Sequence, residues 1–199
     1  MGISGLRSGE LLGLEWHHID WETRVISVEQ SVTLSPDGEA HVKEPKTKGS
    51  RRKVAIPLAM LRELQEYRSY KMDEFEKIGD RWQGNGRYFV FSHPDGRAFH
   101  QKRPYLWFRE FLKKKGLRYI RFHDLRHTSA TFLINQGIHA KVISERLGHG
   151  NIGTTMNVYG HVLRAADQST ADKFESFLEL EPATNVLDKK EQCSDKAKQ

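Results

Sequence analysis

Tyr159 is a residue whose hydroxyl can react only in particular surroundings. It stands ten residues after His149 in the stretch LGHGNIGTTMNVYGHV, residues 147–162. A phenol has a pKa of ~10, so ionising it at neutral pH costs roughly 4 kcal/mol. It can act as a nucleophile only beside cations or a proton acceptor, which His149 and several arginines could supply. The alternative is a core tyrosine whose hydroxyl is simply hydrogen-bonded.

A second polar set, HDLRH at 123–127, combines a guanidinium with two imidazoles. His123, Arg126 and His127 lie near one face of a predicted helix, at spacings of three and four residues. A cation beside an imidazole donor suits an anionic oxygen such as that of a phosphate. The histidine pair also has the spacing of a zinc-binding helix, but Arg126 would place a fixed positive charge beside the metal. Either histidine could instead cap or pack the helix.

Arg7 lies in the segment GLRSGEL, residues 5–11, at a predicted helix start between two glycines. The glycines allow backbone and ligand to approach closely. Glu10, three residues later, could hold the guanidinium in place. Arginines at helix starts are common, so this segment is informative only together with the others.

Two basic clusters favour a polyanionic partner. KEPKTKGSRRK at 43–53 places six basic residues across the turn of a predicted hairpin, and KKKGLRYIR at 113–121 directly precedes the HDLRH helix. A rigid hairpin can carry an ammonium group into a nucleic-acid groove. The alternative is a solvated hairpin tip and a cationic helix end. The net charge of +6 also favours a polyanionic partner.

Helices and a few short strands are predicted to position these side chains. Hydrophobic alternation predicts a strand over 24–30, a turn at 35–38, a returning strand over 40–46 and a third strand over 52–57. Helices are predicted over 6–14, 58–78, 101–115, 123–136, 139–147, 153–162 and 164–180. The expected fold class is therefore α+β, mainly α, with a small antiparallel sheet near the N-terminus.

Composition excludes some broad classes. At 199 residues the chain can form one domain with a sizeable core. Its only cysteine, Cys193, rules out an intrachain disulfide and suits a reducing cytoplasm. No apolar run approaches the length of a membrane span, so no membrane partner is expected.

Six residue types occur in a fixed order along the chain: Arg7, a hairpin lysine, His123, Arg126, His149 and Tyr159. This ordered set closely resembles the catalytic signature of the tyrosine recombinases, the phage integrase family of site-specific DNA recombinases, over about residues 3–178. RFHDLRHTSATFLINQG, ISERLGH and TTMNVYGHV are similar to later motifs of the family. The chain most resembles integrases of phages and integrative conjugative elements. The resemblance implies a tyrosine-recombinase catalytic-domain fold and recombination of double-stranded DNA sites, without metal, ATP or other cofactor.

The resemblance implies a role for each residue of the set. Tyr159 attacks a scissile phosphate, giving a 3′-phosphotyrosyl link and a free 5′-hydroxyl. Arg7 and Arg126 clamp the non-bridging oxygens, on which negative charge builds in the transition state. His149 donates a further hydrogen bond to the phosphate.

Proton transfer is assigned in the same way. His123 accepts the tyrosine proton, and a lysine of the basic hairpin protonates the departing 5′-oxygen. Family members usually place this lysine just before the turn, which favours Lys46 and leaves Lys48 as the close alternative.

The resemblance also sets expectations for domains and assembly. Arg7 stands too near the start for the helical core-binding domain that precedes it in the family. We therefore expect a catalytic domain over 1–180, truncated at its N-terminus, and a disordered polar tail over 181–199. The family implies a tetramer on two duplexes, whereas this fragment alone is expected to be monomeric and to bind DNA weakly and salt-sensitively.

Two other functions are kept open. One is DNA binding without catalysis, in which FLINQGIHAKVISERLGH at 132–149 forms a helix–turn–helix around Gly137. The other is a metal-dependent hydrolase built on His123 and His127.

Overall fold

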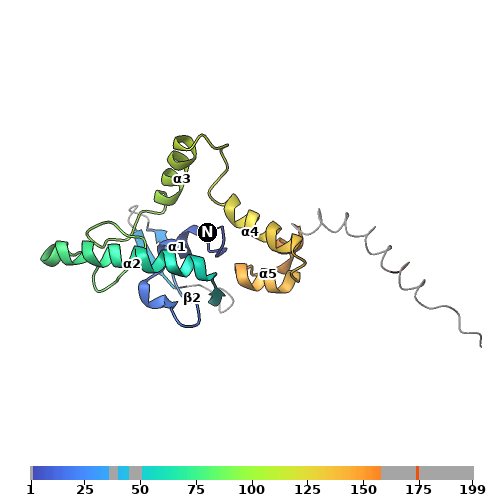
Figure 1. The fold of residues 1–199 in the computed structure, drawn as a ribbon, viewed down its shortest axis with the longest axis horizontal. Coiled ribbons are helices and arrows are strands. Elements are labelled where there is room, and N and C mark those ends of the chain that lie inside the picture. Colours follow the sequence, from blue (N-terminus) through green and yellow to red (C-terminus); the bar gives the residue numbers. More distant parts are fainter. Residues whose placement is uncertain (1, 36–39, 45–50, 158–173, 175–199) are drawn as a thin grey trace, which may run out of the picture. The chain divides into compact units, whose positions relative to one another are not determined.

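The computed structural model describes residues 2–35, 40–44, 51–157 and 174 of the chain (Figure 1). The chain divides into two units, Met1–Tyr159 and Gly160–Gln199, and the helices and strands below all belong to the first. Several expectations fall outside the described residues. They concern most of the turn at 35–38, the hairpin tip with Lys46 and Lys48, Tyr159, nearly all of the helix over 164–180, and the tail over 181–199.

The first helix, α1 (Ser8–Leu12), lies within the predicted range 6–14 and is two residues shorter at each end. Arg7 is its N-cap residue, and the Arg7 backbone N–H donates to the Glu10 carboxylate at 2.8 Å. A carboxylate in the first turn is also favoured by the helix dipole. Leu12 is buried in the core. The short helix therefore holds Arg7 and Glu10 in a fixed relation to each other.

Three short strands form the main sheet, in the antiparallel order β1 (Ile19–Asp20), β2 (Val25–Val28) and β5 (Arg52–Ala55). Ile26 pairs with Val54, and both are fully buried. The alternation that predicts the strands is thus explained by one core-facing side of the sheet. The turn η1 (Trp16–His18) leads into this sheet.

The pairing of the second predicted strand was wrong. The strand over 40–46 was expected to return along 24–30, but β4 (Ala40–Lys43) pairs with β3 (Ser31–Leu34) in a separate two-stranded sheet. The chain leaves β2 at Gln30, whose side-chain amide donates to the Gly13 carbonyl and to the Glu15 carboxylate. Residues 43–53 consequently link the two sheets, and β4 and β5 do not pair in the part of the hairpin that is described.

The longest helix, α2 (Leu58–Ile78), has the predicted bounds. It follows Pro57, stops at Gly79 with φ of +51°, and leads into η3 (Gly79–Arg81). Leu61 and Leu64 pack against the sheet. The core around them consists of Leu6, Leu14, Trp16, Ile19, Ile26, Val28, Val54, Ile56, Leu61, Leu64 and Val90. None of the described helices combines the length and apolarity required to span a bilayer.

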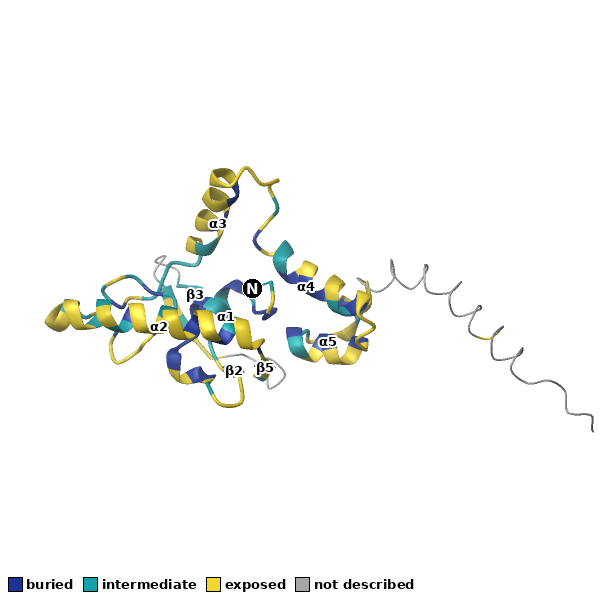
Figure 2. Ribbon diagram, in the orientation of Figure 1, coloured by how far each residue is buried: buried dark blue, intermediate teal, exposed yellow. Residues whose placement is uncertain are grey.

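The remaining helices are α3 (Arg103–Lys114), α4 (Asp124–Asn135) and α5 (Ala140–Leu147). Most of α3 is exposed, with Phe108 and Leu112 on its buried side (Figure 2). α4 turns into α5 at Gly137, where φ is +73°, and Ile134 and Ile143 are buried on these two helices. Because α5 also contacts β5, its C-terminal end lies close to Arg52. The predicted α+β, mainly α class with a small antiparallel sheet is confirmed.

Candidate active site

Two of the predicted arginines converge on the loop that carries His149. α5 ends at Leu147, and Gly148 adopts the left-handed conformation, with φ of +65°, that turns the chain back. Arg126, on α4, donates to the carbonyls of Gly5 and Leu147. Arg7 donates to the Gly148 carbonyl at 2.5 Å. Three segments that are distant in sequence are therefore joined at one place.

Glu10 bridges two guanidinium groups at this place. Its carboxylate accepts a hydrogen bond from Arg7 Nη1 at 2.8 Å and is paired with Arg52 through Nη2 at 2.8 Å and Nη1 at 3.0 Å. Burial alone would raise the pKa of Glu10, but the hydrogen bonds and charges of Arg52 and Arg7 lower it to about 2. The predicted support of Arg7 by Glu10 is present in this geometry.

Arg52 was missed as part of the site. Its side chain is only 7% exposed, and its Nε donates to the Arg146 carbonyl at 2.8 Å. A Cβ on Gly148 would lie 2.7 Å from Arg52 Nη1, so only glycine lets the loop approach so closely. One signal was available: Arg52 is two residues before the buried Val54 and therefore shares the inward face of β5.

The cluster has an excess of positive charge. Among the described side chains, the Glu10 carboxylate is hydrogen-bonded to the guanidinium groups of Arg7 and Arg52. It also stabilises the charge of Arg126 electrostatically. Burial, followed by repulsion from Arg7, lowers the pKa of Arg126 to about 10. Arg126 therefore remains a cation at neutral pH. Arg126 is 3% exposed and Arg7 40% exposed, so Arg126 forms the floor of the cluster and Arg7 its accessible edge.

His149 lies in the loop to which both arginines donate. Its Nδ1 is 2.8 Å from the hydroxyl of Thr155, which belongs to the helical residues 152–157. Burial, and then the positive charges of Arg126 and Arg7, lower the pKa of His149 to about 4. The ring is therefore neutral at neutral pH and presents one N–H group and one bare nitrogen.

His123 lies on the protein surface and not in the buried arginine cluster. It is exposed at the N-terminus of α4, where its carbonyl accepts a hydrogen bond from the Arg126 N–H at 3.0 Å, and within the described residues no hydrogen bond joins its imidazole to Arg7, Arg126 or His149. Burial lowers its pKa, as do His127 and then Arg126. A neutral imidazole with an available lone pair can accept a proton.

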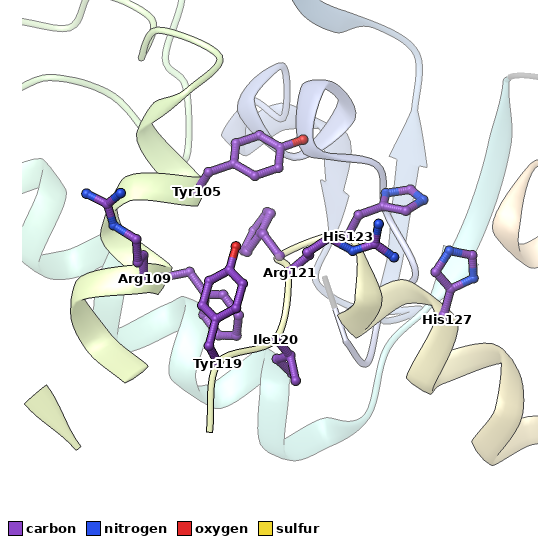
Figure 3. Close-up of a pocket in the computed structure, with 9 residues that line it drawn as sticks. Tyr105, Arg109, Tyr119, Ile120, Arg121, His123 and His127 are labelled. Atoms are coloured by element: carbon purple, nitrogen blue, oxygen red, sulfur yellow. The ribbon is translucent and has the colours of Figure 1, made fainter. Parts of the chain in front are cut away.

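A cavity of about 430 Å³ opens beside His123 (Figure 3). Tyr105 and Tyr119 stand on two sides of it, with Arg109 and Arg121 at its edge. The Tyr105 hydroxyl is 2.9 Å from that of Ser8, the residue after Arg7. The cavity thus adjoins both the arginine segment and the HDLRH helix, and it offers aromatic faces and cations together.

A metal site at the histidine pair has little support. The rings of His123 and His127 are 5.0 Å apart between centroids, and no group of three or more metal-ligating side chains occurs where the structure is described. Arg126, one turn along α4, adds the unfavourable positive charge.

The chain is similar to known proteins over most of its length. The sequence matches the Phage integrase family over residues 1–165. The ICEBs1 integrase of Bacillus subtilis (strain 168) is 36% identical over 178 residues, which are 88% of this chain and 47% of that protein. A XerC-like tyrosine recombinase of Caldanaerobacter subterraneus is 35% identical over 169 residues, covering 80% of this chain and 43% of that protein. The chain thus spans about half the length of the curated relatives it matches.

Solved structures show the same fold. The Tn1549 transposon integrase in complex with transposon right end DNA superposes with a TM-score of 0.72 at 23% identity, over 86% of this chain and 56% of that one. XerA recombinase gives a TM-score of 0.63 at 21% identity, over 84% of this chain and 54% of that one. With the family match extending over most of its length and relatives above one-third identity, the chain belongs to the phage integrase family.

Proposed function

We propose that this chain is the catalytic domain, over residues 1–180, of a site-specific DNA recombinase. It cleaves and rejoins DNA through a 3′-phosphotyrosyl intermediate at Tyr159. The observation that carries the proposal is the convergence of Arg7, Arg126 and His149 on the loop after α5. A site with excess positive charge and a neutral imidazole is suited to one phosphodiester group.

Charge stabilisation is assigned to the arginines. Arg7, at the accessible edge, binds a non-bridging oxygen with the N–H groups that Glu10 and Gly148 do not use. Arg126 adds a permanent positive charge from the floor, where burial strengthens its interaction with the pentacoordinate transition state. Because guanidinium groups supply this charge, the chemistry requires no metal ion.

Proton transfer is assigned to His123 and to a lysine of the basic segment. His123, neutral at neutral pH, accepts the proton of the Tyr159 hydroxyl as its oxygen attacks phosphorus. The bond from phosphorus to the 5′-oxygen breaks, and Lys46, or Lys48, protonates the leaving oxygen. In the second step a 5′-hydroxyl of the partner duplex attacks the phosphotyrosine. Bond energy is conserved, so no ATP is needed.

The proposed partner is duplex DNA, bound by a tetramer that holds two sites together in the cytoplasm. The cavity beside His123 belongs to the proposed DNA-contact surface, since arginine side chains and tyrosine hydroxyls bind the phosphates of a duplex. Relatives with this fold include an integrase solved with transposon right end DNA.

DNA docking without catalysis is the weaker reading. α4 and α5 do form two helices around Gly137, as a helix–turn–helix requires. But Arg126 is buried and bound to backbone carbonyls, and a passive docking motif needs no such buried cation.

A nicked suicide substrate tests the proposal. The DNA carries the recombination junction of the element that encodes the chain, with a nick close to the cleavage position so that the released fragment diffuses away. The wild-type protein is expected to form a covalent adduct that survives denaturing electrophoresis, and Tyr159→Phe to form none. Tyr70→Phe, the same change at an exposed tyrosine of α2, is the matched control and retains the adduct. An adduct of equal yield in Tyr159→Phe would refute the assignment.

A further inference from the structure

A buried hydroxyl lies against the imidazole of His149. Thr155 is 0% exposed, and its Oγ1 is 2.8 Å from Nδ1 of His149. The hydroxyl stands six residues after the histidine and four before Tyr159. The contact therefore connects the loop that the arginines bind with the segment that carries the proposed nucleophile.

The direction of this hydrogen bond decides which ring nitrogen carries the proton. A neutral imidazole has one N–H and one lone pair, so Nδ1 either donates to the hydroxyl or accepts from it. If Nδ1 accepts, Nε2 carries the hydrogen and is a donor. If Nδ1 donates, Nε2 is bare and repels an anionic oxygen.

Among the residues that the structure describes, the hydroxyl hydrogen of Thr155 has one hydrogen-bond acceptor. The residue is shielded from water, and among the described residues the hydrogen-bond partner of Oγ1 is Nδ1 of His149. A helical threonine can instead donate to the carbonyl four residues earlier, as Thr128 does to Asp124 at 2.9 Å. Thr155 makes no such bond to Asn151. A buried donor left without an acceptor costs ~1–3 kcal/mol, so the hydrogen points to Nδ1.

We propose that Thr155 is a positioning residue that donates its hydroxyl hydrogen to Nδ1 of His149 and so fixes the Nε2–H tautomer. Since Nδ1 is occupied by Thr155, Nε2–H is the group left to donate to an oxygen of the bound phosphate. Only this last step rests on the proposed function. The tautomer itself is a property of the free protein.

Two guanidinium groups lie near this histidine and help to keep its ring neutral. Arg126 and Arg7 donate to the carbonyls of Leu147 and Gly148, directly before His149, and burial and then their charges lower the pKa of the ring. A neutral ring carries its proton on one of two nitrogens. Without the threonine hydrogen, Nδ1 is no longer held as an acceptor, and the tautomer with a bare Nε2 becomes populated.

Nitrogen-15 NMR of the whole chain, labelled at histidine, measures the tautomer directly. The shifts and N–H couplings of both ring nitrogens are recorded near neutral pH, and the His149 signals are identified by their loss in His149→Gln. Wild type and Thr155→Ser, which keeps the hydroxyl, are expected to show Nε2–H alone. Thr155→Val, similar in shape without the hydroxyl, is expected to populate Nδ1–H. The same change at the exposed neighbour, Thr154→Val, leaves the wild-type pattern.

Either of two results would overturn the proposal: Nδ1–H in the wild type, or pure Nε2–H in a folded Thr155→Val. The wild-type and serine spectra decide the first point even if the valine variant does not fold.

A kinetic measurement separates this proposal from the proposed function. With the suicide substrate, Thr155→Val is expected to form adduct about 10- to 100-fold more slowly, and Thr155→Ser to recover most of the rate. An unchanged rate in Thr155→Val refutes the positioning role. If the wild type forms no adduct while the tautomers behave as expected, the proposed function fails and the Thr155–His149 assignment stands.

Discussion

Replacing Glu10 with glutamine removes the carboxylate that holds Arg7 and Arg52 together. Glu10 and Arg52 are 8% and 7% exposed, so the change removes a buried carboxylate from beside a buried guanidinium. Breaking a buried ion pair in this way costs ~3–5 kcal/mol.

The pKa of Glu10 gives a second value for the contribution of this carboxylate to the free energy of unfolding. A folded-state pKa of about 2, against 4.5 for the free carboxyl, corresponds to about 3 kcal/mol at ~1.4 kcal/mol per pKa unit. Because the folded pKa is depressed, this stability is present above pH 4.5 and is lost as the pH falls toward 2.

Urea unfolding followed by tryptophan fluorescence measures the prediction. At neutral pH, Glu10→Gln is expected to lower the free energy of unfolding by about 3 kcal/mol. The difference from wild type should shrink as the pH falls below 4.5, because protonated Glu10 resembles glutamine. Comparing the two proteins at each pH cancels the titration of groups they share.

A surface ion pair provides the control. Glu44 pairs with Arg51 at 2.7 Å but is 80% exposed, and Glu44→Gln is expected to change stability by less than ~1 kcal/mol. Equal stability of Glu10→Gln and wild type at neutral pH, or a gap that persists unchanged to pH 2, would refute the reasoning about the buried bridge.

Four further outcomes are expected. Arg126→Lys, which loses the forked donation to two carbonyls, should slow adduct formation by ~10²–10³-fold, measured with the suicide substrate. His149 should titrate near pH 4 by NMR, and since its pKa is lowered from 6.5, the folded state should lose stability as pH falls between these values, less so in His149→Gln. Tyr119→Ala should weaken binding to junction DNA by ~1–3 kcal/mol, because it removes a hydroxyl that can donate to a phosphate. Arg109→Ala should instead reduce the salt slope of binding by about 0.9, both measured by fluorescence anisotropy.

Local signals predicted the elements whose ends are marked in the sequence. α2 has the bounds predicted from its amphipathic pattern, and it is flanked by Pro57 and Gly79, because a proline favours a helix start and a glycine its end. β3 was missed because the predicted strand ends at Gln30 and residues 31–34 were assigned to no element. Between β2 and β3 the Gln30 amide contacts Gly13 and Glu15, and these contacts are tertiary.

The site was predictable as an ordered set of residues but not as a network. The resemblance singled out Arg7, Arg126 and His149, which the fold brings together. Arg52 stands in a run of basic residues, and its difference from Arg51 depends on which face of β5 is covered. Thr155 likewise has a specific role only once the turn after His149 brings the two side chains within 2.8 Å.

The three-way junction of Gly5, Arg126 and Leu147 has a consequence for fragments of the chain. The carbonyls that orient the buried guanidinium come from opposite ends of the unit, so the site forms only when both ends have joined the same fold. Cutting the backbone between α2 and α3 would place Gly5 and Arg126 on different fragments, and the site would return only on reassociation of both pieces.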